Sequence, residues 1–173
     1  MLGFISVPPS RTVRAMRGEN INAGDDARFA ATGVKGPGGF PRGGPEDGKI
    51  ASAGDARYSA LDEQSSTRWP KLDIPKRFRE AEFVWEMTEP VPTRSFEFFI
   101  TKDNWDPDKP LTRDSFYLLP ILHHDAQGKR RTSLQRMVPL EGYHTGYHVI
   151  LGVWNSADNE SAVYQVVDVN FTT

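Results

Sequence analysis

The amino-acid sequence predicts an all-β fold, an antiparallel β-sandwich, and two observations support this prediction. After Lys76 the chain consists of segments that alternate apolar and polar residues or form apolar runs of strand length. Turns rich in glycine and proline separate these segments, and no long helical period interrupts them. Strands with this punctuation are typical of two antiparallel sheets that pack face to face.

The expected elements follow one another in a simple order. A first strand is expected over residues 2–11. Ten of the fifteen glycines lie in residues 18–54, so this stretch is expected to form loops, with short helical turns near DARYSALDEQ at residues 55–64. Five later segments have the pattern of strands: AEFVWEM (81–87), SFEFFIT (95–101), SFYLLPIL (115–122), YHVILGVW (147–154) and AVYQVVDVNF (162–171).

Length and composition limit the classes of protein to consider. The 173 residues are expected to form one domain, residues 1–173, with a loop insertion at 18–75 and the main strands at 76–173. The formal net charge of −2 provides no global basic field, so neither nucleic acid nor a membrane is expected as a partner. The sequence has no cysteine and no recognisable secretory leader, which predicts a cytoplasmic location.

Five segments carry a family resemblance along nearly the whole chain. They are GFISVPPSR, GFPRGGPEDGKIASAG, LDEQSSTRW, ITKDNWDPDKPLTRDSF and YHVILGVWNSAD. In these segments the chain resembles the bacterial lytic polysaccharide monooxygenases, formerly called chitin-binding proteins. The resemblance implies an immunoglobulin-like or fibronectin III-like sandwich with a large loop region after the first strand. It also implies an ancestral activity, the copper-dependent oxidative cleavage of crystalline chitin or cellulose.

The resemblance also implies a metal site whose ligands have changed. The family binds copper through a histidine brace, formed by an N-terminal histidine and a second histidine. By this resemblance, Leu2 stands at the first histidine position and Leu134 at the second, while Val163 stands at an axial aromatic position. Lys35 stands where the family often carries a carboxylate. Because leucine has no lone pair to offer copper, we expect no copper, no other cofactor and no catalytic residue here.

The chain has four histidines, and none is expected to replace the brace. His123 and His124 are adjacent, so in an extended segment their side chains point to opposite faces, and only an adventitious ion is expected there. His144 and His148 are four residues apart in a segment that resembles a strand. Such a spacing corresponds to roughly 13 Å along a strand, too far for two ligands of one metal ion.

A candidate binding face follows from the same alignment. Its members are Leu2, Phe29, Lys35, Leu134, Arg136 and Val163. An apolar cluster rimmed by charge often marks an interface, but the leucines could equally fill the emptied copper site. Phe29 matches an aromatic residue that meets the sugar in chitin-active relatives, and it is either a sugar platform or an anchor for its loop. The four tryptophans are expected to pack inside: Trp69, Trp85, Trp105 and Trp154.

These observations favour a catalytically silent relative, not an enzyme, that acts as a cytoplasmic protein-binding, adaptor or structural domain. A protein partner or a second copy of the chain is then expected. The most specific form of this hypothesis links the protein to a secretion machine that needs no signal peptide. The alternative is a non-catalytic module that binds chitin or another polysaccharide. A third interpretation, an active copper-dependent monooxygenase, requires a natural N-terminus other than Met1–Leu2 and is opposed by Leu134.

Overall fold

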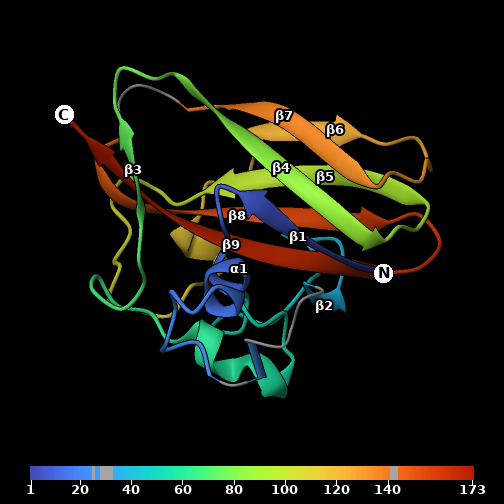
Figure 1. Cartoon of the computed structure of the whole chain (residues 1–173), viewed down its shortest axis with the longest axis horizontal. Helices are drawn as coiled ribbons and strands as arrows, with labels where there is room; N and C mark the ends of the chain where they lie inside the picture. The colour runs from blue at the N-terminus through green and yellow to red at the C-terminus, as the bar shows by residue number, and fades with distance from the viewer. Residues whose placement is uncertain (25, 28–32, 141–143) are drawn as a thin grey trace.

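The computed structural model describes residues 1–24, 26–27, 33–140 and 144–173, and its strands form two sheets packed face to face (Figure 1). The first sheet has the order β1-β4-β7 and contains β1 (Leu2–Val7), β4 (Glu80–Glu89) and β7 (Ser133–Pro139). The second has the order β2-β9-β8-β5-β6 and contains β2 (Val34–Pro37), β9 (Ser161–Thr172), β8 (Gly146–Ser156), β5 (Thr93–Ile100) and β6 (Leu122–Asp125), with β3 (Leu72–Pro75) parallel to β9. The helices with described bounds are α1 (Arg11–Met16) and the 3-10 helices η1 (Ala56–Asp62) and η2 (Arg113–Ser115). The predicted antiparallel sandwich of immunoglobulin or fibronectin type is confirmed.

The first strand is shorter than predicted, and a helix follows it. β1 ends at Val7, because two prolines come next and cannot donate backbone hydrogen bonds to a neighbouring strand. Ser10 then caps α1, with its hydroxyl oxygen accepting a hydrogen bond from the amide of Val13 at 3.3 Å. Residues 8–11 therefore connect the first sheet to the loop region.

Two other segments also differ from the prediction. Residues 115–122 form no continuous strand: Pro120 interrupts the apolar run, Leu119 is exposed, and β6 begins only at Leu122. The loop insertion at 18–75 contains two short strands, β2 and β3, that both pair with β9. Neither strand shows the alternating pattern on which the prediction relied.

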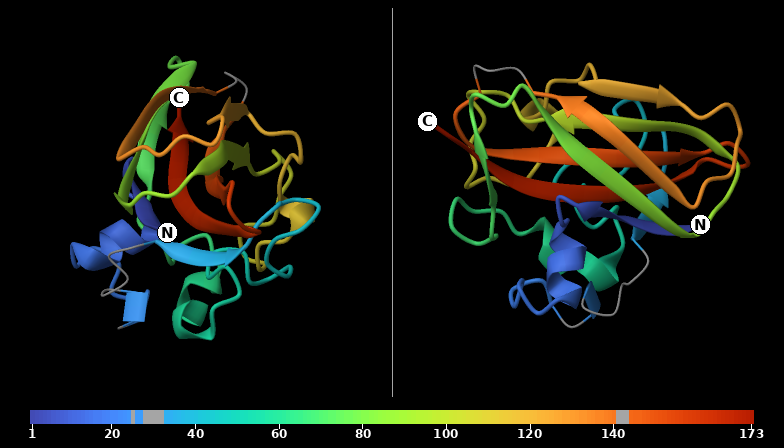
Figure 2. Two further views of the ribbon diagram at one scale, coloured as in Figure 1. Left: turned by 90° about the vertical axis from the view of Figure 1, so that its right-hand side faces the viewer. Right: turned by 45° about the horizontal axis from the view of Figure 1, so that its top comes forward.

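The loop region covers the face of the second sheet that lies opposite the first sheet (Figure 2). The molecule therefore has two apolar cores, one between the sheets and one between the second sheet and the loops. β9 contributes to both: Val163 and Val167 belong to the first core, and Tyr164 and Val166 to the second. The predicted alternation along this strand is confirmed.

The tryptophans pack largely as predicted. Trp85 and Trp154 are fully buried between the sheets, with ring centres 6.1 Å apart. Trp69 is buried in the second core. Trp105 is half-buried and packs against the same core. The three buried rings serve the fold and are not available as a binding stripe.

The start of β8 differs from the expectation in a way that concerns two histidines. The strand begins at Gly146, whose φ of +71° turns the chain, so His144 precedes the extended backbone. The ring centres of His144 and His148 lie 5.1 Å apart. The prediction that these residues are too far apart to share a metal ion is therefore wrong. Both are buried, and burial together with the neighbouring His144 lowers the pKa of His148 to about 4.

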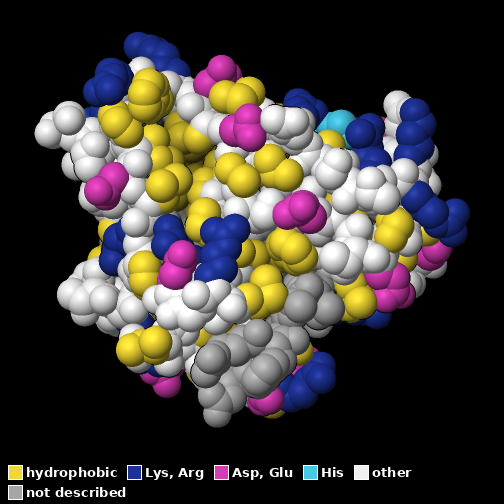
Figure 3. Space-filling model, viewed as in Figure 1, with side chains coloured by type: hydrophobic (Ala, Val, Ile, Leu, Met, Phe, Trp, Pro, Cys, Tyr) yellow, Lys and Arg dark blue, Asp and Glu magenta, His cyan; other side chains and the backbone are white. Residues whose placement is uncertain are grey.

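Charges of both signs occupy the surface that carries the first sheet. Figure 3 shows Lys and Arg side chains interspersed with Asp and Glu side chains, with apolar side chains between them. In the described parts of the chain, no helix is both long and apolar enough to cross a membrane.

Candidate functional site

A hollow of about 460 Å³ lies near the N-terminus. It is lined by Leu2, Gly33, Lys35, Gly36, Asp55, Arg57, Tyr58 and Ser161. These residues come from β1, β2 with the preceding Gly33, η1 with its capping residue, and the start of β9. The fold thus brings four segments that are distant in the sequence to one place.

A larger hollow of about 580 Å³ is a weaker candidate. Its aromatic member, Trp105, is already engaged within the fold. The ring packs edge-on against Tyr147 at 5.1 Å and donates its N–H to the Tyr147 carbonyl oxygen at 3.0 Å. The hollow beside Leu2 is the better candidate, because it also contains Lys35, a second residue that the sequence singled out.

Gly33 allows the segment before β2 to approach β1. Gly33 has a φ of +81°, and a Cβ atom at this position would lie 1.7 Å from the carbonyl oxygen of Gly3. No other residue type fits there. Two residues later, Lys35 pairs with Val163 of β9. Directly paired residues of antiparallel strands project from the same face of a sheet. The side chain of Lys35, on the edge strand of the second sheet, therefore lies beside that of Val163.

The start of η1 presents an ordered ion pair and an aromatic ring. Asp55 accepts hydrogen bonds from the Arg57 amide at 3.0 Å and from Nε and Nη2 of Arg57 at 3.1 and 2.7 Å. The hydrogen bonds from Arg57 lower the pKa of Asp55, and those to Asp55 raise the pKa of Arg57. Both groups therefore stay charged at neutral pH. The Arg57 guanidinium also lies 5.1 Å from the centre of the Tyr58 ring.

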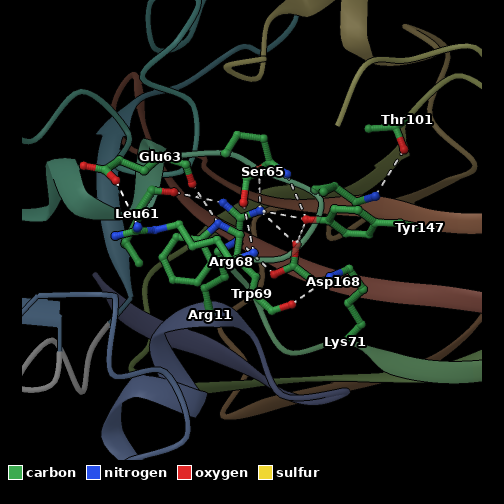
Figure 4. Close-up of polar contacts among 12 residues, drawn as sticks. Arg11, Leu61, Glu63, Ser65, Arg68, Trp69, Lys71, Thr101, Tyr147 and Asp168 are labelled. Atoms are coloured by element: carbon green, nitrogen blue, oxygen red, sulfur yellow. Dashed lines mark hydrogen bonds and ion pairs between the residues drawn. The ribbon is translucent and has the colours of Figure 1, made fainter. Parts of the chain in front are cut away.

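A buried network holds η1 against the second sheet (Figure 4). Arg11 of α1 donates from Nε and Nη2 to the two carboxylate oxygens of Asp168 in β9, at 2.8 Å each. Its Nη1 donates to the carbonyl oxygen of Leu61 at 2.9 Å, and Nη2 donates to Gln64 at 2.6 Å. Tyr147 donates to Asp168 at 2.6 Å. Because Leu61 belongs to η1, this network fixes the helix that carries Tyr58.

Electrostatics keep this network in its hydrogen-bonding form. Burial lowers the pKa of Arg11, but the adjacent Asp168 carboxylate raises it, and the net direction is upward. Burial and the charge of Asp168 raise the pKa of Tyr147, which stays protonated and can donate. The Arg11 guanidinium also stacks on Trp69, 4.6 Å from the ring centre. Each buried polar group of the network thus has a partner suited to its charge.

The hollow combines groups that suit a ligand with an apolar face and hydroxyl groups at its edge. The half-buried ring of Tyr58 offers a flat apolar surface. Arg57 and Lys35 offer hydrogen-bond donors, and Asp55 offers an acceptor. A few convergent polar groups around an apolar surface are typical of small-molecule and saccharide sites.

The structure unites some of the predicted site residues and separates others. Leu2 and Lys35 line the hollow, and Val163 lies below Lys35 with no exposed surface. Phe29 lies outside the described residues. Arg136 is half-buried on β7 and bonds through Nη1 to Nδ1 of His124, away from Leu2. The six residues therefore do not form one exposed face.

Leu134 does not occupy the position assigned to it. Leu134 of β7 pairs with Trp85 of β4, whereas Leu2 of β1 pairs with Glu89 of β4. Four strand residues, about 13 Å, separate these two pairing positions, so Leu134 and residue 2 cannot share one ion. Leu134 is 4% exposed and belongs to the core between the sheets. Its assignment as the second brace position was wrong, because sequence alignment alone does not show strand register.

The residues around Leu2 do not fit a copper brace. A brace needs nitrogen ligands beside residue 2, and the Leu2 side chain has none. The amino group of Met1 pairs with Oε1 of Glu89 at 3.0 Å. The four histidines all lie among the described residues, either on β6 or at the end of the sandwich opposite Met1 (Figure 1). Copper therefore does not fit the residues present at this position.

Besides the two glycines, Gly33 and Gly36, four members of the hollow were missed by sequence reasoning: Asp55, Arg57, Tyr58 and Ser161. A local signal for three of them exists in the segment DARYSALDEQ. An aspartate two residues before an arginine at a helix start predicts a cap and an ion pair, and the next residue is aromatic. Nothing in the sequence places this segment beside Leu2. Its position there depends on the hydrogen bonds that Arg11 makes to η1 and β9.

Comparisons with known proteins agree on one family. Residues 3–169 match the family described as "Lytic polysaccharide mono-oxygenase, cellulose-degrading". GlcNAc-binding protein A of Shewanella oneidensis is 37% identical over 174 residues, which cover 99% of this chain and 36% of that protein. GlcNAc-binding protein A of Vibrio cholerae is 41% identical over 147 residues, which cover 83% of this chain and 29% of that protein. The chain thus spans about a third of the length of these relatives.

Solved structures give the same result for the fold. The catalytic domain of a lytic polysaccharide monooxygenase from Listeria monocytogenes is 42% identical, with a TM-score of 0.91 and coverage of 99% of both chains. An AA10 lytic polysaccharide monooxygenase from Photorhabdus luminescens is 41% identical, with a TM-score of 0.92 and coverage of 98% of both chains. The similarity covers the loop region as well as the sandwich.

These comparisons contradict two expectations. The expectation that the chain is not an enzyme is contradicted because a similar structure is the catalytic domain of a monooxygenase. The expectation of a cytoplasmic location is contradicted by relatives named for binding N-acetylglucosamine and by structures named for action on polysaccharides. That expectation also relied on where the sequence begins. A chain that spans a third of its relatives gives no information about a leader.

Proposed function

This chain belongs to the lytic polysaccharide mono-oxygenase family, and on this premise we propose that it is a polysaccharide-binding domain whose ligand is chitin. The hollow beside Leu2 is the proposed contact site. The observation that carries the proposal is the ordered group of Asp55, Arg57 and Tyr58 beside Lys35. Relatives that share 37% and 41% identity are named for binding N-acetylglucosamine, the monomer of chitin.

In this proposal the exposed part of the Tyr58 ring, beside the Arg57 guanidinium, contacts the apolar face of one sugar. The pairing of Arg57 with Asp55 holds the guanidinium over the ring, so neither side chain loses much conformational freedom when the ligand binds. Lys35 and Arg57 donate to hydroxyl and carbonyl oxygens of the chain. A solid polysaccharide presents the same groups at every repeat, so one hollow with one aromatic ring can contribute to binding at many positions.

Chitin is favoured over cellulose by the mixed character of the lining. Chitin differs from cellulose by an acetamido group at C2, which has an amide N–H, a carbonyl oxygen and a methyl group. Asp55 can accept from the N–H, Lys35 can donate to the carbonyl, and Leu2 offers an apolar surface to the methyl group. The family description names cellulose, so both polymers belong in the test.

A protein-binding function has less support. The apolar face that motivated it depended on Leu134 and Val163, and both side chains are buried between the sheets. Leu2 alone is half-buried and offers a small apolar surface. The polysaccharide proposal therefore replaces the adaptor hypothesis.

Retention on insoluble polysaccharide tests the proposal. Wild-type protein is incubated with β-chitin and with crystalline cellulose, and the bound fraction is measured over a range of protein concentrations. We expect retention on β-chitin and weaker retention on cellulose. Tyr58→Ala removes the stacking surface, and we expect its affinity for β-chitin to fall about tenfold, as a loss of about 1.4 kcal/mol would produce.

A matched control exists elsewhere on the molecular surface, before the opposite end of β4. Arg77 lies over the ring of Phe78 at 4.9 Å, and Phe78 is 50% exposed, so this pair resembles Arg57 and Tyr58 in chemistry but lies outside the hollow. Phe78→Ala should retain wild-type affinity. Equal losses in both variants, or strong chitin retention by Tyr58→Ala, would show that the hollow is not the binding site.

A further inference from the structure

Two buried histidines and one exposed carboxylate meet at the end of the sandwich opposite the hollow. One ligand atom from each of Asp103, His144 and His148 lies within 4.8 Å of the other two. Oδ1 of Asp103 is 2.9 Å from Nδ1 of His144 and 3.8 Å from Nε2 of His148. The histidine side chains are 2% and 1% exposed, whereas that of Asp103 is 43% exposed. The histidine side of the group is thus buried, and the Asp103 side is open to solvent, so an ion can enter from there.

Outer hydrogen bonds orient two of these side chains. Nδ1 of His148 lies 2.9 Å from Oγ1 and 3.2 Å from the carbonyl oxygen of Thr101. The hydroxyl of Tyr117 donates to Oδ2 of Asp103 at 3.1 Å, which leaves Oδ1 directed at the histidines. Imidazole and carboxylate ligands of metal ions usually have such outer partners, which hold the ligand atom in position.

An aromatic wall closes the inner side of the group. The ring of Phe171 lies 5.5 Å from the His144 ring and 5.6 Å from the His148 ring, between centres. Trp105 lies 6.5 Å from His148. An apolar wall excludes water and strengthens the attraction between a carboxylate and a cation.

The charges in the group favour a cation. In the tautomer of His148 that carries its proton on Nδ1, that proton is donated to Thr101, and the lone pair of Nε2 lies 3.8 Å from Oδ1 of Asp103, with the Thr145 backbone also against the ring. Two acceptors that face each other repel unless a proton or a metal ion lies near both. A divalent ion would meet the negative charge of Asp103 and the lone pairs of the two rings in one place.

We propose that Asp103, His144 and His148 bind a divalent transition-metal ion, with zinc as the best match. Two imidazoles and one carboxylate form a common three-ligand set for zinc, with water at the fourth position. Tetrahedral zinc with bonds of about 2.1 Å places its ligand atoms about 3.4 Å apart. The observed separations of 2.9 and 3.8 Å lie on either side of this value. When the ion binds, it displaces the proton held between His144 and Asp103.

This site goes beyond the proposed function and shares no residue with the hollow. Asp103 follows β5, His144 precedes β8, and His148 lies within β8. A metal ion here joins the loop after β5 to the entrance of β8, so we expect it to raise the melting temperature of the protein. Failure of chitin binding would leave this site untouched, and failure of metal binding would leave the chitin proposal untouched.

Zinc titration of the full chain tests the site. The protein is treated with a chelator, dialysed and titrated with Zn²⁺ in a calorimeter, and Co²⁺ is used in parallel as a spectroscopic substitute. We expect one equivalent with a dissociation constant in the micromolar range or tighter, and visible Co²⁺ absorption bands of a four- or five-coordinate ion. Asp103→Asn and His144→Gln should each weaken binding at least tenfold.

The exposed His123 and the half-buried Glu97, 3.3 Å apart, provide a matched control. His123→Gln removes a histidine beside a carboxylate without touching the site, and its zinc affinity should equal that of wild type. Circular dichroism verifies the fold of each variant, and Asp103→Asn alters an exposed group. Absence of binding by wild type overturns the proposal, as does a fully folded Asp103→Asn variant with unchanged affinity. If only His123→Gln lost zinc affinity, the ion would bind at β6 instead.

Discussion

Arg11 shows how one residue determines the position of a whole segment. Arg11 is 2% exposed, yet all three guanidinium nitrogens donate hydrogen bonds. Their partners are Asp168, Leu61, Gln64 and Tyr147. A buried pair of opposite charges is costly to desolvate, and its removal from one side leaves the other charge unpaired. Arg11 therefore couples the loop region to the second sheet, in addition to the apolar core that joins them.

Arg11→Met tests this coupling at the residue scale. Methionine fills similar space but leaves the Asp168 carboxylate buried without its cation. We expect the free energy of unfolding to fall by about 3–5 kcal/mol. Chemical denaturation measures the change.

Arg14 of the same helix supplies the control for this substitution. It pairs with Glu19 at 3.1 Å on a more exposed surface. Arg14→Met should cost at most about 1 kcal/mol. If Arg11→Met and Arg14→Met lowered the free energy of unfolding by similar amounts, the buried ion pair would contribute no more to stability than the exposed one. The double variant Arg11→Met/Asp168→Leu removes both charges and should recover part of the lost stability.

At the scale of elements, the contact of β1 with the segment before β2 depends on an absent side chain. Gly33 has a positive φ and leaves no room for a Cβ atom against the Gly3 carbonyl oxygen. This contact brings Leu2 and Lys35 to the same hollow. The two strands belong to different sheets, so this contact also closes one end of the sandwich.

Gly33→Ala is expected to open this end of the molecule. The left-handed backbone conformation costs about 1–2 kcal/mol for alanine, and the steric overlap with Gly3 adds to this cost. We expect a lower melting temperature and weaker chitin retention, because Leu2 and Lys35 move apart. Thermal unfolding and the chitin pull-down measure the two effects.

Gly54 distinguishes backbone strain from steric overlap. It has a φ of +79°, and a Cβ atom there would meet nothing within 4 Å. Gly54→Ala should therefore show the backbone cost alone and a smaller drop in melting temperature. If both variants lose the same stability, the contact between β1 and the β2 segment is not tight.

At the scale of the whole molecule, β9 unites the two cores. Val167 packs between the sheets and Val166 packs under the loop region, so adjacent residues stabilise different layers. Neither core can lose its β9 face without disturbing the other. The organisation of residues 1–173 as one domain is a prediction that this arrangement makes testable.

Unfolding experiments with Val166→Ala and Val167→Ala test it. Each substitution removes two buried methyl groups and should cost about 1–3 kcal/mol. If the layers unfold together, each variant shifts one transition, and far-ultraviolet circular dichroism and tryptophan fluorescence report the same midpoint. Two separate transitions, or a Val166→Ala effect seen by one probe only, would show that the loop region unfolds independently.

The sequence by itself determined the sandwich and its longest strands. Alternation in residues 162–171 predicted both faces of β9, and long framework segments identified the family, which the comparisons then confirmed. Such patterns are local: side chains on a strand alternate with a period of two, whatever the strand pairs with. The three buried tryptophans were predicted for the same reason, because large apolar rings in framework segments have few other places to lie.

Only the tertiary structure decided which residues are neighbours. Strand register placed Leu134 opposite Trp85 and away from Leu2. The turn at Gly146 placed His144 against His148, which strand spacing had excluded. The start of η1 reached the hollow through contacts made by Arg11 far away in the chain. Register, turns with positive φ and long-range ion pairs depend on partners that no local window contains, and both proposed sites depend on them.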